Sequence, residues 1–387
     1  MTAVNTPIHI MGAGIAGLTA ALALTQRGFN PRIFEAAPEL RPVGAGIVMA
    51  SNAMQVAKKL GVYDEIRSAG VVLRTFGVAD HRGKPLQLTD ISAVEKRYGA
   101  PSVAIHRGRL QQILLEKLPA GTVETHQRLT ALSPTADGGL EGQFESGKQF
   151  SSRLLIGADG LRSATRRLLW GDMPLRYSTH TCWRGIVPWR LETPGEAKEL
   201  WGKTGGKRVA LIQIDTERVY FYFTLKKKPG FKVAPADLAA FFREEMKEFP
   251  PLYAEVLSAA DPAKVYHDDL YDLKRLPVWH KGAALLIGDA AHATTPNLGQ
   301  GGCQAVEDGY ALARELAQGP DAAAAFARYE ARRRPRTDYV VNTSYQVGLL
   351  SNLGGPVGYP LRNALLKATP ESVASAQFDR LFRLELD

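Results

Sequence analysis

A glycine-rich turn near the N-terminus constrains the fold more than any other feature of this sequence. The apolar segment Ile8–Met11 predicts a short strand, and it leads directly into residues 12–17, GAGIAG. A helix is predicted from about Leu18 to Arg27, and a second strand, Pro31–Phe34, ends at the acidic residue Glu35. This order of strand, turn, helix, strand and acid predicts a βαβ unit that binds a dinucleotide.

Each glycine of the turn has its own physical role. Gly12 permits the tight turn, Gly14 lets a pyrophosphate approach the backbone, and Gly17 lets the helix pack against the strand. Glu35 follows Gly12 by 23 positions, close to the interval of about 20 at which an acid binds the ribose hydroxyls. The fingerprint fits both NAD and FAD, so the choice between them depends on the rest of the chain.

A second glycine-rich stretch, residues 288–303, lies late in the chain. It follows the apolar run Ala283–Ile287, predicted as a buried parallel strand, and precedes a helix predicted from Gln304 to Leu316. Doubly wound sheets bind ligands where their strands end and their helices begin. Its glycines leave room for a flat ligand against the backbone, and the competing interpretation is a glycine-rich turn without a ligand.

The pattern of residues changes between Gly171 and Trp279. Alternating aromatic segments at 179–189, 208–214 and 218–225 predict an antiparallel sheet. We expect an α/β fold with two lobes, in which this sheet is inserted into a Rossmann-like nucleotide-binding lobe and followed by C-terminal helices. The predicted divisions are 1–170 and 281–350 for the nucleotide-binding lobe, 171–280 for the substrate lobe and 351–387 for a C-terminal tail.

The C-terminal part is predicted to be helical. A helix is expected over residues 321–339, with Pro335 kinking or interrupting it because proline lacks a backbone N–H. The tail from Gly354 onward is expected to form short helices separated by proline and glycine breaks.

Composition limits the classes of function. The net charge of +9 is consistent with nucleic-acid binding, but the basic residues are scattered, and the densest runs, Lys226–Lys228 and Arg332–Arg334, are predicted to be solvated surface. We therefore expect no nucleic-acid partner. No apolar window is long enough to span a membrane. The two cysteines, Cys182 and Cys303, form no metal-ligand spacing and fit a reducing compartment, so we expect a cytoplasmic protein without a metal.

Three motifs in this order carry a family resemblance: the fingerprint with Glu35, residues 157–160 (GADG) and residues 288–302. Over about residues 7–345 the chain resembles the single-component FAD-dependent aromatic hydroxylases, built like para-hydroxybenzoate hydroxylase. That family has no separate NAD(P)H domain, and this sequence has no second fingerprint. The resemblance implies bound FAD, NAD(P)H as a transient co-substrate, and hydroxylation of a small electron-rich aromatic or heteroaromatic substrate by O₂ through a flavin C4a-hydroperoxide.

The resemblance also implies which residues bind the cofactor. Glu35 would bind the FAD ribose, Arg107 would reach the cofactor, and Asp159 lies in a segment tied to both FAD and the pyridine nucleotide. Asp289 would hold the ribityl or pyrophosphate region of FAD. The predicted cofactor-binding residues are Gly12, Gly14, Ala16, Gly17, Glu35, Ala36, Arg107, Leu129, Asp159, Asp289, Gly299, Gln300, Gly301 and Gly302.

Within the family, residues 294–303 look closest to the FAD-dependent urate hydroxylases and also resemble zeaxanthin epoxidase. Salicylate and 6-hydroxynicotinate hydroxylases share the frame less specifically. The sequence departs from the urate pattern at Asn297, where an acid is expected, and at Arg184. Three alternative functions remain: an FAD-dependent epoxidase of an apolar alkene, a non-catalytic flavin-binding redox sensor, and a reductase or oxidase that never transfers oxygen.

The substrate side rests on the sheet lobe. The resemblance implies that Arg208 holds an anionic substrate and that Tyr220 bonds to its ring, and surface exposure is the competing interpretation for the arginine. A two-residue turn at Thr216–Glu217 pairs Gln213 with Tyr220 and places Arg208 on the opposite face of the sheet from Tyr220. A loop that differs by one residue places Arg208 and Tyr220 on the same face. Further candidates are Arg184, Tyr222 and Pro296, while Trp183 is predicted as core and His292 as structural.

Overall fold

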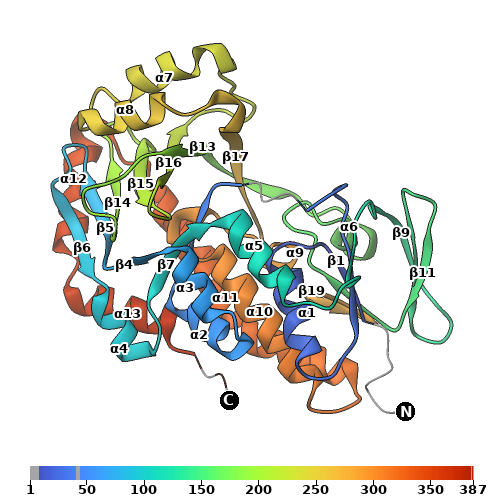
Figure 1. Ribbon diagram of the computed structural model, residues 1–387. Helices are drawn as coiled ribbons and strands as arrows, with labels where there is room; N and C mark the ends of the chain where they lie inside the picture. The colour runs from blue at the N-terminus through green and yellow to red at the C-terminus, as the bar shows by residue number, and fades with distance from the viewer. Residues whose placement is uncertain (1–7, 41–43, 385, 387) are drawn as a thin grey trace. The chain divides into compact units, whose positions relative to one another are not determined.

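The computed structural model describes residues 8–40, 44–384 and 386 (Figure 1). The chain divides into two compact units. Unit 1 comprises residues 1–42, 111–176 and 271–344, and unit 2 comprises residues 43–110, 177–270 and 345–387. Residues 43–110 thus group with the aromatic strands, whereas the sequence places them in the nucleotide-binding lobe. The reason is strand pairing, because β5 (Thr75–Asp80) pairs in parallel with β14 (Glu196–Trp201).

Unit 1 is built around a six-stranded sheet in which β1, at its centre, pairs in parallel with β2 and β12. Its order is β18 (His280–Lys281), β19 (Ala284–Leu286), β12 (Leu154–Gly157), β1 (Ile8–Met11), β2 (Pro31–Phe34) and β8 (Val123–Glu124). A separate three-stranded antiparallel sheet contains β9 (Leu129–Pro134), β10 (Leu140–Phe144) and β11 (Gln149–Ser152). The predicted βαβ unit and the predicted parallel strand before residue 288 are both confirmed.

Unit 1 also contains several helices. They are α1 (Ile15–Thr25), α6 (Ala164–Trp170), α9 (Asp289–His292), α10 (Gly301–Leu316) and α11 (Ala322–Ser351), the last of which belongs to this unit as far as Ser344. α1 and α10 pack closely at Gly309, where an added Cβ would lie 2.6 Å from the Ala20 backbone nitrogen. This contact brings the helix after the first glycine turn against the helix after the second.

Unit 2 contains a seven-stranded sheet, which confirms the antiparallel sheet expected from the aromatic segments. Its order is β17 (Tyr266–Leu273), β13 (Leu175–Pro188), β16 (Arg218–Lys226), β15 (Arg208–Gln213), β14, β5 and β6 (Pro85–Asp90). A second, three-stranded sheet contains β3 (Gly46–Met49), β7 (Ser102–His106) and β4 (Val71–Leu73). The helices are α2 (Ser51–Leu60), α3 (Tyr63–Ala69), α4 (Ser92–Tyr98), α5 (Arg107–Glu116), which belongs to this unit as far as Leu110, α7 (Leu238–Glu245), α8 (Pro251–Ser258), α12 (Gly355–Ala368) and α13 (Glu371–Phe382).

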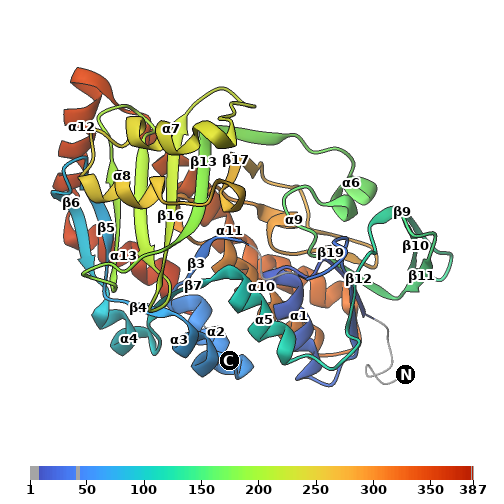
Figure 2. The same cartoon turned by 45° about the horizontal axis from the view of Figure 1, so that its top comes forward.

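The two faces of the seven-stranded sheet differ in chemistry. One face carries Trp183, Val209, Phe221 and Phe223, and these side chains form an apolar core with residues of α7 and α8. Figure 2 shows the two helices lying along this sheet. Because side chains alternate along a strand, the intervening positions point to the other face. That second face carries the polar residues described below.

The C-terminal helices correct one expectation. α11 runs without a break from Ala322 to Ser351 with Pro335 inside it, so the predicted interruption is wrong. The flanking residues Arg333 and Arg336 both bind Glu307 on α10, and these contacts offset the backbone hydrogen bond that proline cannot donate. The tail forms α12 and α13, as the expected short helices.

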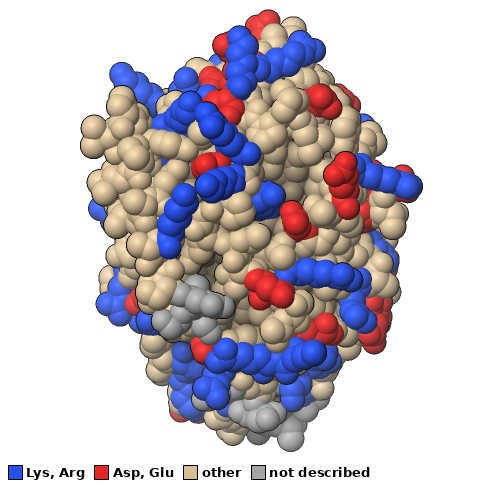
Figure 3. Space-filling view, turned by 90° about the vertical axis from the view of Figure 1, so that its left-hand side faces the viewer, with Lys and Arg blue, Asp and Glu red and all other residues tan. Residues whose placement is uncertain are grey.

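The charged surface is mixed. On the face shown in Figure 3, Lys and Arg side chains are interspersed with Asp and Glu side chains and with uncharged surface. None of the helices in the described ranges combines the length and the apolar character needed to cross a membrane.

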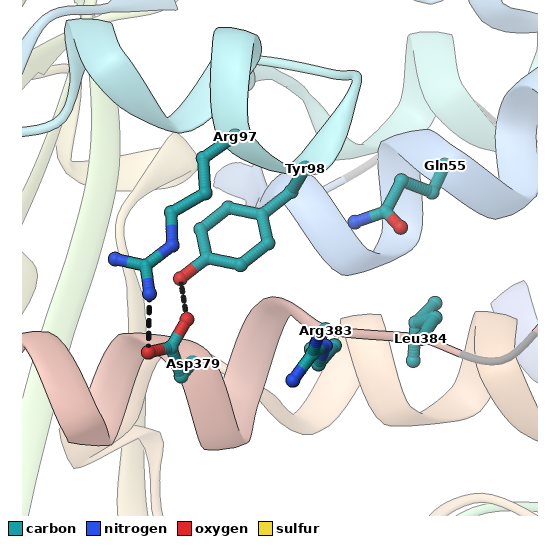
Figure 4. Close-up of a pocket in the computed structure, with 6 residues that line it drawn as sticks. All are labelled: Gln55, Arg97, Tyr98, Asp379, Arg383 and Leu384. Carbon is teal, nitrogen blue, oxygen red and sulfur yellow. Dashed lines mark hydrogen bonds and ion pairs between the residues drawn. The ribbon is translucent and has the colours of Figure 1, made fainter.

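A surface pocket lies between α2, α4 and α13 of unit 2 (Figure 4). In it, Arg97 Nη2 lies 2.6 Å from Asp379 Oδ2, and the Tyr98 hydroxyl donates to the same carboxylate. Burial and this carboxylate raise the pKa of Tyr98 to about 12. The six lining residues include no predicted site residue. We therefore interpret the contacts of Arg97 and Tyr98 with Asp379 as the interactions that hold the C-terminal helix α13 against α4.

The buried His180 of β13 predicts a pH dependence of stability. Its side chain is 0% exposed, and burial, together with the charge of Arg208, lowers its pKa to about 4. The unfolded value is about 6.5, so the unfolded chain takes up this proton first as the pH falls from 6.5 to 4. We expect His180 to reduce the free energy of unfolding by about 2 kcal/mol at pH 4.5 relative to pH 7.

Urea unfolding of the wild type and of His180→Gln at both pH values measures this effect. The variant should lose less stability than the wild type between pH 7 and pH 4.5. Equal losses would show that His180 does not titrate in this way.

Candidate functional site

The first glycine turn of unit 1 has little room for side chains. Gly12 has φ +101°, and an added Cβ would lie 2.6 Å from the Ala158 carbonyl oxygen. At Gly17 an added Cβ would lie 2.0 Å from the Gly12 carbonyl oxygen. Gly14 differs, because among the described residues beyond its chain neighbours none places an atom within 4 Å of the Cβ position. The turn is therefore tight where helix α1 meets the strand and open at Gly14, as a phosphate-binding turn requires.

Glu35 is oriented by the backbone beside this turn. Its Oε2 accepts a hydrogen bond from Ala13 N at 2.7 Å, and its Oε1 accepts one from Ala37 N at 2.8 Å. A carboxylate has further lone pairs, so each oxygen can still accept from a ribose hydroxyl. The intervening predicted residue, Ala36, is half-buried.

The Asp159 carboxylate accepts its hydrogen bonds from residues at the start of α6. Its Oδ2 accepts from Thr165 N at 2.9 Å and from Thr165 Oγ1 at 3.0 Å, and the Ser163 hydroxyl donates to its Oδ1. The carboxylate therefore fixes the turn that follows β12. Leu129, at the start of β9, has its side chain in the apolar core with Met11 and Phe34, so only its backbone is available to a ligand.

The second glycine stretch begins beside the first. An added Cβ at Gly288 would lie 2.9 Å from the Ala16 Cβ, so the start of α1 packs directly on this loop. Gly299 has φ +64°, and apart from its chain neighbours the part of the chain that the structure describes has no atom within 4 Å of its Cβ position. Asn297, in a short 3-10 turn that begins at Pro296, donates from Nδ2 to Thr295 Oγ1 at 3.0 Å and to the Ser344 carbonyl at 2.8 Å. The loop is thus anchored to α11 and remains open at a glycine.

A buried polar network holds the other end of this loop. Asp308 Oδ2 accepts from Gly288 N at 2.8 Å and lies 2.6 Å from His292 Nε2. Arg333 Nε donates to Asp308 Oδ1 at 2.7 Å. Although burial alone would raise it, the pKa of Asp308 is held well below its usual range by His292 and Arg333. His292 is therefore structural, as predicted.

Arg333 corrects a prediction made from the sequence. The run Arg332–Arg334 was expected to be solvated surface, but Arg333 is only 4% exposed. It binds two adjacent acids, Glu307 and Asp308, inside a helix whose other residues are mostly buried. Such a pair of acids in a buried helix needs a buried cation, and that was the available signal.

These features fit a bound FAD. The open faces at Gly14 and Gly299 leave room against the backbone, and Glu35 supplies an acceptor beside the turn. Asp289 is exposed at the start of α9, and Gln300 is the residue before α10, whose first turn contains Gly301 and Gly302. The amino end of α10, a helix of 16 residues, favours a negative charge.

The strand register in unit 2 resolves the substrate-side alternatives. Gln213 pairs with Val219 and Arg208 pairs with Thr224, so Arg208 and Tyr220 lie on the same face of the sheet. Arg208 is not a surface charge, because its side chain is 2% exposed. Its Nε donates to Thr224 Oγ1 at 3.2 Å, and its Nη1 lies 3.4 Å from Glu199 Oε1. Trp183 is buried in the apolar core on the opposite face, as predicted.

The other predicted residues of unit 2 gather on this polar face. Tyr220 and Tyr222 have ring centroids 5.9 Å apart, and Arg184 pairs across the strands with Tyr222. Arg184 Nη2 lies 2.5 Å from Asp268 Oδ2. The Tyr220 ring packs on Gly46, where an added Cβ would lie 2.5 Å from it, and the charge of Arg107 acts on Tyr220.

The structure therefore forms two groups from the predicted residues. The glycine turns, Glu35, Asp159 and Asp289 belong to unit 1, while Arg107, Arg184, Arg208, Tyr220 and Tyr222 belong to unit 2. Glu199 was not predicted, and its strand residues 196–201 (EAKELW) carry no pattern that distinguishes it from the two neighbouring charged residues.

Several known proteins are similar to this chain in sequence. The family described as FAD binding domain matches residues 5–344. 2-Heptyl-3-hydroxy-4(1H)-quinolone synthase from Pseudomonas aeruginosa is 35% identical over 386 residues, which cover 97% of each chain. Aurachin C monooxygenase/isomerase from Stigmatella aurantiaca is 35% identical over 364 residues, which cover 93% of each chain.

A solved structure is similar over the same length. HpxO from Klebsiella pneumoniae, complexed with FAD and uric acid, has 29% sequence identity and a TM-score of 0.88, and the match covers 97% of this chain and 96% of HpxO. The predicted fold class and the predicted FAD cofactor are confirmed by these matches. The chain therefore belongs to the FAD-binding family of single-component flavoprotein hydroxylases, and it is an FAD-dependent oxidoreductase.

Proposed function

We propose that this protein is an FAD-dependent monooxygenase that hydroxylates a fused, nitrogen-containing heteroaromatic ring, with 4(1H)-quinolones as the leading substrate class. The observation that carries the proposal is the polar face of the seven-stranded sheet, where Arg184, Tyr220 and Tyr222 flank one another. The named product of the P. aeruginosa relative is a hydroxylated quinolone, and uric acid in the HpxO structure is also a fused nitrogen heterocycle.

The reaction balances with one external reductant. Bound FAD supplies the redox chemistry, in which NAD(P)H gives two electrons, one oxygen atom of O₂ enters the substrate and the other leaves as water. In a 4-quinolone the ring nitrogen donates electron density to the carbon beside the carbonyl. That carbon loses its hydrogen as a proton and gains the hydroxyl group.

The chain's own residues bind and orient the two ligands. In unit 1, the open glycine turns and Glu35 would hold FAD, and the Asp308 network fixes the loop at Gly288. In unit 2, the tyrosine hydroxyls would donate to the ring carbonyl. Burial raises the pKa of Tyr220 and of Tyr222 above the usual range, so both phenols keep their protons at neutral pH.

The same face weighs against the alternative functions. An epoxidase of an apolar alkene would need an apolar floor, whereas this face presents a glutamate, two arginines and two tyrosines. A redox sensor would need no such polar lining. NAD(P)H as the reductant and a cytoplasmic location complete the proposal.

Steady-state oxidation of NADH and of NADPH tests this function. The purified yellow protein is given 2-heptyl-4(1H)-quinolone, urate, salicylate or 6-hydroxynicotinate, and the product mass and peroxide are measured in the same sample. We expect the quinolone to accelerate NAD(P)H oxidation and to yield a product heavier by one oxygen atom. Oxidation that yields only peroxide with every ring would contradict the proposal.

A further inference from the structure

Four residues form one row across the polar face of unit 2. Glu199 on β14 pairs with Ala210 on β15, Ala210 pairs with Tyr222 on β16, and Tyr222 pairs with Arg184 on β13. Neighbouring strands lie about 4.8 Å apart, so the row spans roughly 14 Å from the glutamate to the arginine. The row therefore has an acceptor at one end, a phenol and a guanidinium at the other, and a single methyl group between them.

The short side chain of Ala210 leaves a depression in the row between Glu199 and Tyr222. Glu199, Tyr222 and Arg184 are longer than Ala210, and each keeps part of its surface exposed, while Ala210 is buried. The Glu199 side chain retains 14% of its surface even though it is bonded to the buried Arg208. A flat ring resting on Ala210 would therefore meet a carboxylate on one side and Tyr222 on the other.

Both arginines of this face already have a carboxylate partner. Arg208 Nη1 lies 3.4 Å from Glu199 Oε1, and Arg184 Nη2 lies 2.5 Å from Asp268 Oδ2. Each pair is neutral overall, so the row offers hydrogen-bonding groups without a net positive charge from these two residues. Such a site favours a neutral ring over an anion, because the Glu199 carboxylate is the more exposed charge of its pair and would repel an anion, whereas Arg208 is buried.

We propose that Glu199 accepts a hydrogen bond from the ring N–H of a neutral vinylogous amide, such as a 4(1H)-quinolone, whose carbonyl oxygen is bound from the Tyr222 side of the row. This inference rests on the proposed function. It further states that the substrate binds in its neutral form and that Glu199 selects this form. Arg208 acts here as the counter-ion of Glu199 and as its positioning residue, which replaces the predicted role of Arg208 as an anchor for an anionic substrate.

The same hydrogen bond has a consequence for reactivity. A carboxylate that accepts a hydrogen bond from the N–H group leaves more electron density on the ring nitrogen and, through the conjugated double bond, on the carbon beside the carbonyl. That carbon is the one that gains oxygen. Glu199 therefore contributes to turnover as well as to binding, and its replacement should lower kcat together with affinity.

The inference is tested by comparing the binding of two ligands that differ only at the ring nitrogen, so that the result does not depend on a single variant. The wild-type holoenzyme is titrated with 2-heptyl-4(1H)-quinolone and with its N-methyl analogue, and the dissociation constants are read from the flavin absorbance change. The same ratio of dissociation constants is measured for Glu199→Gln and for Glu199→Leu. Glu196→Leu is the matched control, because Glu196 lies on the same strand and points to the opposite face.

We expect the wild type and Glu196→Leu to bind the N–H ring at least about tenfold more tightly than the N-methyl ring, which corresponds to the loss of one charge-assisted hydrogen bond. In Glu199→Leu the ratio should fall toward one, and Glu199→Gln should lie between. If the N-methyl group weakened binding only through its size, the ratio of dissociation constants would be the same in every variant. A ratio that stays unchanged in Glu199→Leu with retained flavin would overturn the inference.

The two proposals fail in different ways. If the quinolone gains oxygen but the ratio does not depend on Glu199, the assignment of Glu199 is wrong and the monooxygenase function stands. If the ratio depends on Glu199 but no oxygenated product forms, the proposed reaction is wrong. The double variant Glu199→Gln with Arg208→Gln removes both charges of the pair. It shows whether the effect of Glu199→Gln comes from the lost negative charge of the acceptor or from leaving Arg208 unpaired.

Discussion

Replacing Arg333 with methionine is expected to lower the free energy of unfolding by about 3–5 kcal/mol. The substitution keeps the length of the side chain but leaves Glu307 and Asp308 without the cation that binds both of them. Because Asp308 also accepts from Gly288 N, the loop before α9 should loosen and the protein should lose FAD. Thermal unfolding and the flavin absorbance of the purified variant measure the two effects.

Arg332→Met is the matched control on the same helix. Arg332 is 40% exposed, and its partner Glu315 also binds Arg328, so this substitution should cost less than about 1 kcal/mol and leave FAD bound. Similar losses of stability in both variants would contradict the assignment of Arg333 as the buried counter-ion.

Replacing Gly17 with alanine is expected to abolish FAD binding and to destabilise unit 1. The new Cβ would lie 2.0 Å from the backbone oxygen of Gly12, so α1 would have to move away from the turn. Gly14→Ala should behave differently, because its Cβ meets no atom within 4 Å from the described residues beyond its chain neighbours. It should fold normally and weaken FAD by at least about tenfold, since its methyl group occupies the space for the pyrophosphate.

Reconstitution of the flavin-free proteins with FAD, followed by fluorescence, gives the affinities. Gly319→Ala serves as the control and should bind FAD like the wild type. Gly319 has no positive φ, and within the described ranges its Cβ position meets no atom within 4 Å beyond its chain neighbours. If Gly14→Ala binds FAD with unchanged affinity, the phosphates do not approach that glycine and the assignment of the turn is wrong.

The nucleotide-binding part of unit 1 could be predicted from the sequence because local chemistry determines it. The tight turn at Gly12, the close helix contact at Gly17 and the acid at Glu35 each require a particular residue at a particular spacing. The same holds for the strand before Gly288, which is a continuous apolar run. In these stretches the residues that contact one another are either close in the sequence or separated by an interval that is typical of the motif.

The substrate face could be predicted only in part because it depends on register and on distant pairs. One residue in the β15–β16 loop decides whether Arg208 shares a face with Tyr220, and no local pattern specifies that loop length. The burial of Arg208 depends on Glu199, and that of Arg333 depends on Glu307 and Asp308 of another helix. A charged residue in the sequence therefore looks like surface until its partner is identified.

Incorporation of oxygen from ¹⁸O₂ tests the central claim most directly. The holoenzyme is supplied with NADH or NADPH, 2-heptyl-4(1H)-quinolone and ¹⁸O₂ in ordinary water, and the product is analysed by mass spectrometry. A monooxygenase places one ¹⁸O atom in the quinolone product, with consumption of one NAD(P)H for each product molecule. A product whose new oxygen comes from water, or NAD(P)H oxidation that yields peroxide and unchanged quinolone, would contradict the account.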